Sequence, residues 1–187
     1  MKLSDWVEGH ARDLLKPLGG RWRHSEAVAG VAQELAHLLA PDDSDVLVAS
    51  AFLHDVGYAP ELAISGFHPL DGARHVLALG HVRLAGLVAY HTAARQEARL
   101  RGLDGALAEF EDERSIVSAA LAYCDLTTGP SGEPMTPRQR LLDVQVRYGE
   151  ESPVTLSLRA AWPELMDAVM QVDALRSDAG VVFAHPR

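Results

Sequence analysis

The amino-acid sequence predicts an all-α fold, and three observations carry this prediction. Apolar residues recur at helical spacing along most of the 187 residues. Alternation typical of strands does not persist, and β-hairpin signals are missing. Proline and glycine gather in short segments that separate the helical stretches. We therefore expect one compact helical bundle over residues 1–187, with its core at about 21–126 and C-terminal helices at about 136–176 packed on that core.

The first three helices follow from apolar stripes and from the breaks between them. Residues 3–15 carry apolar side chains on one face, and the segment 16–20, with its proline and two glycines, ends this stripe. Residues 21–39 form a second stripe that stops before Pro41. Residues 45–56 are apolar nearly all round, which predicts a central helix packed on most sides.

The later helices are separated by loops with glycine and proline at residues 57–66 and 127–134. Pro69 and Pro137 each suit the first turn of a helix. We expect the tail after the last helix to be loose. The helices predicted in this part cover residues 69–79, 81–91, 93–112, 113–126, 136–148 and 153–176.

The composition excludes several classes of protein. The chain carries 17 basic and 26 acidic side chains, a net charge of −9, which argues against binding to duplex nucleic acid. This charge does not exclude a nucleotide substrate, because a metal ion can supply local positive charge. No apolar run approaches 18 residues, so we expect no membrane-spanning helix. Cys124 is the single cysteine, so no internal disulfide can form, and we expect a reducing compartment, the cytoplasm.

Several histidines and aspartates occupy the ends of apolar helices. His24 lies in the first turn of the second predicted helix, His54 and Asp55 end the most apolar one, and His91 and Asp125 end two later ones. Helix ends can converge at one end of a bundle, where sites form from side chains on facing helices. Imidazole and carboxylate together suit a divalent transition metal, whereas a cysteine-type zinc site is excluded. A local ion pair between His54 and Asp55 is the alternative interpretation.

The order His24, His54-Asp55 and Asp125 resembles the H…HD…D signature of the HD-domain metal-dependent phosphohydrolase superfamily. The local contexts also match: RWRHS around His24, AFLHDVG around the HD pair and LAYCD up to Asp125. The resemblance covers about residues 21–126, and the fold of the superfamily is all-helical. It implies that His24, His54, Asp55 and Asp125 hold a metal ion.

Two further segments are similar to HD families that bind two metal ions, notably the bacterial diadenosine tetraphosphatase branch. These segments are HPLDGA, which begins at His68, and YHT, which contains His91. The similarity implies a second metal ion held by His68 and His91, with Asp55 as the bridge. Iron or manganese is favoured, and zinc, cobalt or nickel would also fit. A loop histidine without a ligand role is the alternative interpretation of His68.

The chain departs from the superfamily pattern at Tyr58. Many HD hydrolases have a lysine three residues after the HD aspartate, so a cationic contact to phosphate is expected to be missing at this position. The GYP-type signature of the cyclic-di-GMP branch and the Glu-Asp motif of the (p)ppGpp hydrolases are also absent. Neither of those two branches is expected.

The sequence and the resemblance together lead us to expect a metal-dependent phosphohydrolase that acts on a nucleotide or a similar small phosphate ester through a metal-activated water. Asp55 is the predicted catalytic residue, because it would hold the metal and steer that water. Arg21 is predicted to bind substrate phosphate, with a solvated arginine as the alternative, and Thr128 to bind another part of the substrate. Two other functions stay open: a regulatory module that binds metal or nucleotide without turnover, and a di-iron oxygenase. We expect no duplex nucleic acid and no membrane as partner, and the sequence leaves a homodimer open.

Overall fold

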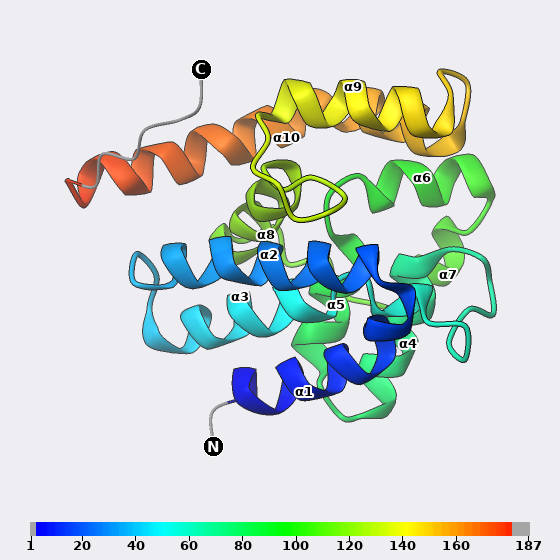
Figure 1. Ribbon diagram of the computed structural model, residues 1–187, viewed down its shortest axis with the longest axis horizontal. Coiled ribbons are helices and arrows are strands. Elements are labelled where there is room, and N and C mark those ends of the chain that lie inside the picture. Colours follow the sequence, from blue (N-terminus) through cyan, green and yellow to red (C-terminus); the bar gives the residue numbers. More distant parts are fainter. Residues whose placement is uncertain (1–2, 181–187) are drawn as a thin grey trace.

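The computed structural model describes residues 3–180, and within that range it confirms the all-α prediction. The described residues form ten α-helices, two short 3-10 helices and no strand beyond one isolated bridge (Figure 1). The 3-10 helices are η1 (Lys16–Leu18) and η2 (Val56–Tyr58). The α-helices are α1 (Leu3–Leu15), α2 (Gly20–Ala36), α3 (Pro41–Leu53), α4 (His68–Ala78), α5 (Val82–Tyr90), α6 (Ala94–Arg101), α7 (Asp104–Leu107), α8 (Ile116–Leu126), α9 (Pro137–Tyr148) and α10 (Pro153–Asp178).

Several boundaries differ from the sequence prediction, and three of these differences bear on the prediction most. Helix α3 begins at Pro41, earlier than predicted, because proline suits the first turn and two aspartates that follow it complement the helix dipole. The helix predicted at residues 93–112 is divided into α6 and α7, because Gly102 adopts a left-handed conformation with φ 70° and ends α6. Helix α10 continues to Asp178, and most of the predicted loose tail lies outside the described residues.

The main hydrophobic core surrounds α3, in which every residue from 47 to 53 is buried. Helices α1 and α2 lie along α3, and α9 and α10 run side by side along one edge of the molecule (Figure 1). A second apolar cluster includes Leu126, Leu158 and Leu165 and joins α8 to α9 and α10. The C-terminal helices therefore rest on the helix that carries Asp125.

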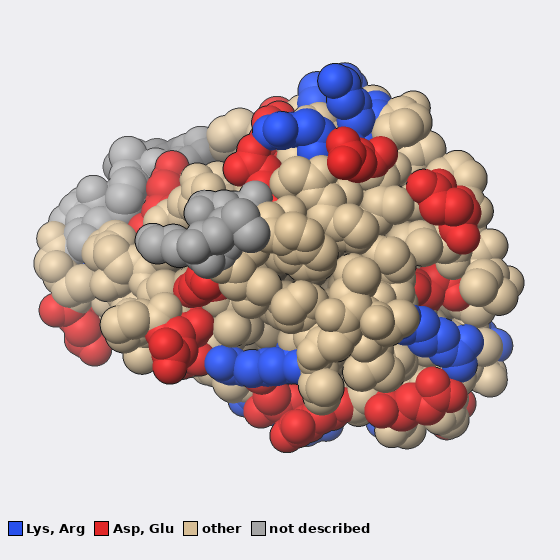
Figure 2. Space-filling model, turned by 90° about the horizontal axis from the view of Figure 1, so that it is seen from below, with Lys and Arg blue, Asp and Glu red and all other residues tan. Residues whose placement is uncertain are grey.

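The surface agrees with the acidic composition. On the face shown in Figure 2, basic side chains lie in small groups next to acidic ones, without one continuous basic patch. A patch of that kind is the usual footprint of a protein that binds duplex nucleic acid. Among the described helices, none has the length and apolar character needed to cross a membrane.

Candidate metal centre

The six side chains predicted as metal ligands come together at one end of the bundle, each from the end of a helix. Helix α2 supplies His24 from its N-terminal part, and α3 ends just before His54 and Asp55. The others sit where α4 begins (His68), just after α5 ends (His91) and near the end of α8 (Asp125). Five of the six are buried, and His68 is partly exposed. In the sequence these residues are up to 101 positions apart.

The first cluster contains His24, His54 and Asp55. The Nε2 atoms of His24 and His54 lie 3.3 Å apart, and Nε2 of His54 lies 3.6 Å from Oδ1 of Asp55. Asp125 joins this cluster through His24, whose Nε2 lies 3.1 Å from its Oδ1. The four ligands implied by the HD signature are therefore neighbours.

The second cluster contains Asp55, His68 and His91. Nε2 of His68 lies 3.3 Å from Oδ1 of Asp55 and 3.2 Å from Nε2 of His91. Oδ1 of Asp55 thus faces both clusters, so Asp55 would be the residue that the two ions share. The structure brings together the residues predicted for the second metal ion as closely as those predicted for the first.

The backbone fixes the tautomer of three of these histidines. Each Nδ1 lies within hydrogen-bond distance of a carbonyl oxygen, and a carbonyl can only accept, so each Nδ1 carries the hydrogen. In the neutral ring the Nε2 lone pair then points into the site, which is the arrangement usual for histidines that bind metal. The Nδ1···O distances are 2.9 Å from His24 to Gly129, 2.8 Å from His54 to Ala51 and 2.7 Å from His91 to Val88.

The site contains more acceptors than hydrogens to satisfy them. Nε2 of His54 lies 3.3 Å from Nε2 of His24 and 3.6 Å from Oδ1 of Asp55, and Nε2 of His91 lies 3.2 Å from Nε2 of His68. Crowded buried acceptors are unfavourable unless a cation lies between them. Imidazole nitrogen and carboxylate oxygen are the donors that iron, manganese, zinc and cobalt accept. The residues present therefore fit a divalent transition metal.

Two of the histidines and both carboxylates have protonation states that suit metal ligation, whereas His24 is the exception. Burial lowers the pKa of His54 to about 4 and lowers that of His68 well below 6.5, so both rings are neutral at neutral pH. Burial favours a raised pKa for the two carboxyl groups, but their cationic and histidine neighbours outweigh it. The pKa values of Asp55 and Asp125 are therefore lowered, and both are ionised. Burial opposes protonation of His24, but its hydrogen bond to Asp125 prevails and raises its pKa.

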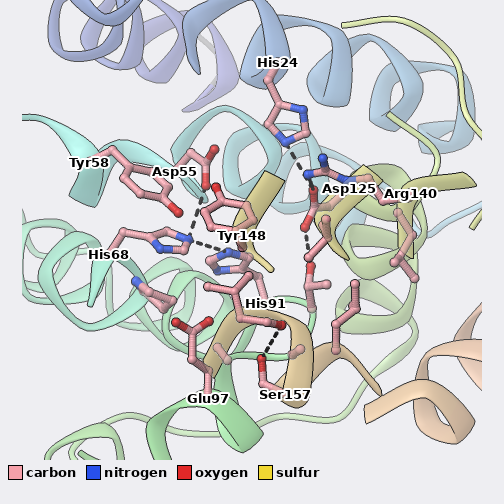
Figure 3. A pocket seen from close by; sticks show the side chains of 18 of the residues that line it. His24, Asp55, Tyr58, His68, His91, Glu97, Asp125, Arg140, Tyr148 and Ser157 are labelled. Atoms are coloured by element: carbon pink, nitrogen blue, oxygen red, sulfur yellow. Dashed lines mark hydrogen bonds and ion pairs between the residues drawn. The ribbon is translucent and has the colours of Figure 1, made fainter. Parts of the chain in front are cut away.

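All the predicted ligands except His54 line a cleft with a volume of about 90 Å³, which is room for several water molecules (Figure 3). Three arginines line it as well: Arg21 from α2, and Arg140 and Arg147 from α9. Leu126, Val144, Val154 and Leu158 form an apolar wall, to which α8, α9 and α10 contribute. The cleft thus combines clustered metal donors, cations and an apolar surface, as small-molecule sites do.

Tyr58 stands where many HD hydrolases have a lysine, and its ring contacts an arginine from another helix. The guanidinium of Arg21 lies 3.7 Å from the centre of the Tyr58 ring, and this ring stacks on His68 with 4.0 Å between ring centres. Arg21 also donates to Oδ2 of Asp55 at 3.2 Å and to the hydroxyl of Tyr148 at 3.1 Å. Helix α2 thus supplies a cation next to Tyr58 from 37 positions away in the sequence.

The structure places Thr128 away from the cleft. Its side chain is buried, and its hydroxyl donates to the carbonyl of Cys124 at 2.8 Å, one turn back along the chain. Thr128 is not among the described residues that line the cleft. Its predicted contact with substrate has no support in this geometry, whereas Arg21 does line the cleft.

Sequence reasoning missed two polar neighbours of Asp125. The hydroxyl of Thr92 donates to its Oδ2, and Arg140 donates to its Oδ1 at 3.3 Å. Thr92 has a φ of 51°, a conformation that a β-branched residue adopts only when its surroundings impose it. The only feature of the sequence that pointed to Thr92 was its position directly after His91.

Gly57 permits the close approach that joins the two clusters. A Cβ at this position would lie 2.0 Å from the carbonyl oxygen of His68 and 2.6 Å from the backbone nitrogen of Gly72. Only glycine lets η2 lie against the start of α4 at this distance. The contact sets Asp55, two residues before Gly57, beside His68.

Comparison with known proteins agrees with this geometry. The family model of the HD domain matches residues 21–145, two thirds of the chain, so the protein belongs to the HD-domain family. This superfamily consists mostly of metal-dependent hydrolases. Neither the curated proteins nor the solved structures contain a significant match to the chain.

Proposed function

We propose that this protein is a metal-dependent phosphohydrolase that acts on a nucleotide or a similar small phosphate ester. The observation that carries the proposal is the position of Asp55, shared by two histidine clusters at the base of a cleft lined by arginines. When bound, two metal ions in these clusters would activate a water and hold the oxygens of a phosphoryl group. The second cluster supports a place in the dinuclear branch of the superfamily, which includes the bacterial diadenosine tetraphosphatases. We propose iron or manganese as the ions.

The charges of the cleft support an anionic substrate. Asp55 and Asp125 contribute two negative charges, and Arg21 and Arg140, which are paired with them, contribute two positive ones. The rings of His54 and His68 are neutral, so these groups balance before any metal ion binds. Divalent ions then make the cleft cationic, which attracts phosphate in spite of the acidic surface.

The side chains of the cleft would have different roles in the reaction. Asp55 holds its charge between the clusters and orients the groups bound there. Arg21 and Arg140 lie beside the ligand carboxylates and would donate hydrogen bonds to phosphate oxygens. The apolar wall contributed by α8, α9 and α10 limits the access of bulk water, which strengthens these interactions.

The experiment that tests this proposal is a phosphate-release screen with manganese, iron and cobalt against nucleotides and simple phosphate esters. The double substitution His54→Ala with Asp55→Ala should abolish release, and the surface substitution Glu109→Gln should leave it unchanged. Binding of nucleotide without any release would instead support a regulatory module. Oxygen consumption with an organic substrate would support a di-iron oxygenase.

A further inference from the structure

The cleft has a second polar region on the side away from His24. Figure 3 shows Glu97 and Ser157 there, with His91 between them and the upper part of the site. Glu97 comes from α6 and is 7% exposed. Apart from Asp55 and Asp125, it is the one carboxylate among the described residues that line the cleft.

The two carboxylate oxygens of Glu97 differ in their partners. Arg101, one helical turn further along α6, directs two nitrogens at the same oxygen, Oε1, at 2.7 Å. The described residues provide no hydrogen-bond partner for Oε2. This oxygen is also not one of the fully enclosed polar atoms, so it is not sealed off from the cleft. Because Glu97 lines the cleft, Oε2 remains available to a bound molecule.

The lining of the cleft near Glu97 includes a hydroxyl acceptor and apolar surface. The hydroxyl of Ser157 donates to the carbonyl of Val154 at 2.9 Å, so its oxygen keeps only acceptor capacity towards the cleft. The nearby lining residues Pro69, Ala93 and Ala94 are apolar. This side of the cleft therefore complements a hydrogen-bond donor, whereas the opposite side, with Arg21 and Arg140, complements an anion.

We propose that Glu97 selects substrates that carry an amine or another N–H donor on the organic part of a phosphate ester. The inference rests on the proposed function, because the metal clusters and arginines would fix the phosphate end. A substrate without the donor leaves a buried carboxylate oxygen desolvated and unpaired. Such a loss reduces binding by about tenfold to a hundredfold. Arg101 is a positioning residue, since it occupies Oε1 and turns Oε2 to the cleft.

The test compares the binding of matched phosphonates, which resist hydrolysis, to the manganese-loaded protein by calorimetry. Each pair consists of an ω-aminoalkyl phosphonate and the alkyl phosphonate of the same length, with three to five carbons. The wild type should bind at least one amino compound tenfold or more tighter than its partner. Glu97→Gln should bring that ratio close to one. Glu109→Gln, which removes a matched glutamate–arginine pair on the surface, should preserve it.

The outcomes separate this inference from the proposed function. Equal binding within every pair, or a preference that survives Glu97→Gln, would overturn the role of Glu97 and leave the phosphohydrolase intact. Failure of all phosphonates and all phosphate esters would overturn the proposed function and this inference with it. If Glu97→Gln does not fold, Glu97→Asp serves instead, because its shorter side chain keeps the charge but withdraws Oε2, and the preference should again be lost.

Discussion

The substitution Gly57→Ala should damage one metal cluster more than the other. The added Cβ would lie 2.0 Å from the carbonyl oxygen of His68, whereas ordinary contact begins at 3.4 Å, so η2 and α4 must separate by roughly 1.4 Å. The obstructing atoms are backbone, so no rotamer change relieves them. Nε2 of His68 is 3.3 Å from Oδ1 of Asp55, and metal ligation tolerates errors of only about 0.2 Å.

We expect Gly57→Ala to lower the free energy of unfolding by about 3 kcal/mol, the upper range for overpacking. For a chain of this size that corresponds to a decrease in Tm of about 6–12 °C. The metal content should fall from two ions to one, because His68 and His91 lose their place beside Asp55. Thermal unfolding and elemental analysis measure the two effects.

Gly30→Ala is the matched control, because a Cβ at Gly30 in α2 meets no atom within 4 Å. It should leave the metal content unchanged and stabilise the chain by about 0.5–1 kcal/mol. If Gly57→Ala melted within a degree of the wild type and still bound two ions, the close contact between η2 and α4 would not be what aligns the clusters.

Three further predictions concern single side chains. Thr92→Val removes the hydroxyl that donates to Asp125 and should weaken metal binding about tenfold to a hundredfold in competition with a chelator; unchanged affinity would refute this role. Arg140→Met should raise the inhibition constant of inorganic phosphate about tenfold, since it removes a charged donor, and an unaltered constant would show that Arg140 does not bind phosphate. Burial and His10, whose Nε2 lies 2.8 Å from that of His75, lower the pKa of His75 from 6.5. As the pH falls below 6.5, the unfolded state therefore takes up a proton before the folded state does, and the folded state loses stability. His75→Gln should lose less stability than the wild type between pH 7.5 and pH 5.5 in urea unfolding, and equal losses would contradict the assignment.

The ligand positions could be predicted from the sequence because helix ends are local features. Apolar stripes that stop at His54, His91 and Asp125 locate those side chains at helix ends, and the HD signature joins them into one site. Gly57 showed no such signal, because its role depends on a contact with α4 that only the fold creates.

The surroundings of the ligands depend on contacts between distant segments, which periodicity does not reveal. From the sequence, Tyr58 is only a residue that replaces the lysine of many HD hydrolases. The fold shows that Arg21 stacks on its ring. Thr128 follows Asp125 closely, which suggested a place in the cleft. A hydroxyl one turn beyond a helix carbonyl can instead bond back to it, and Thr128 does so with Cys124.

The most direct test of the account is the number of metal ions in the protein purified without a chelator, measured by elemental analysis against protein concentration. Two clusters that share Asp55 predict two divalent transition-metal ions per chain, and none in the Asp55→Ala variant. A folded wild-type chain that holds no such ion, or an Asp55→Ala variant that still holds two, would contradict the central claim.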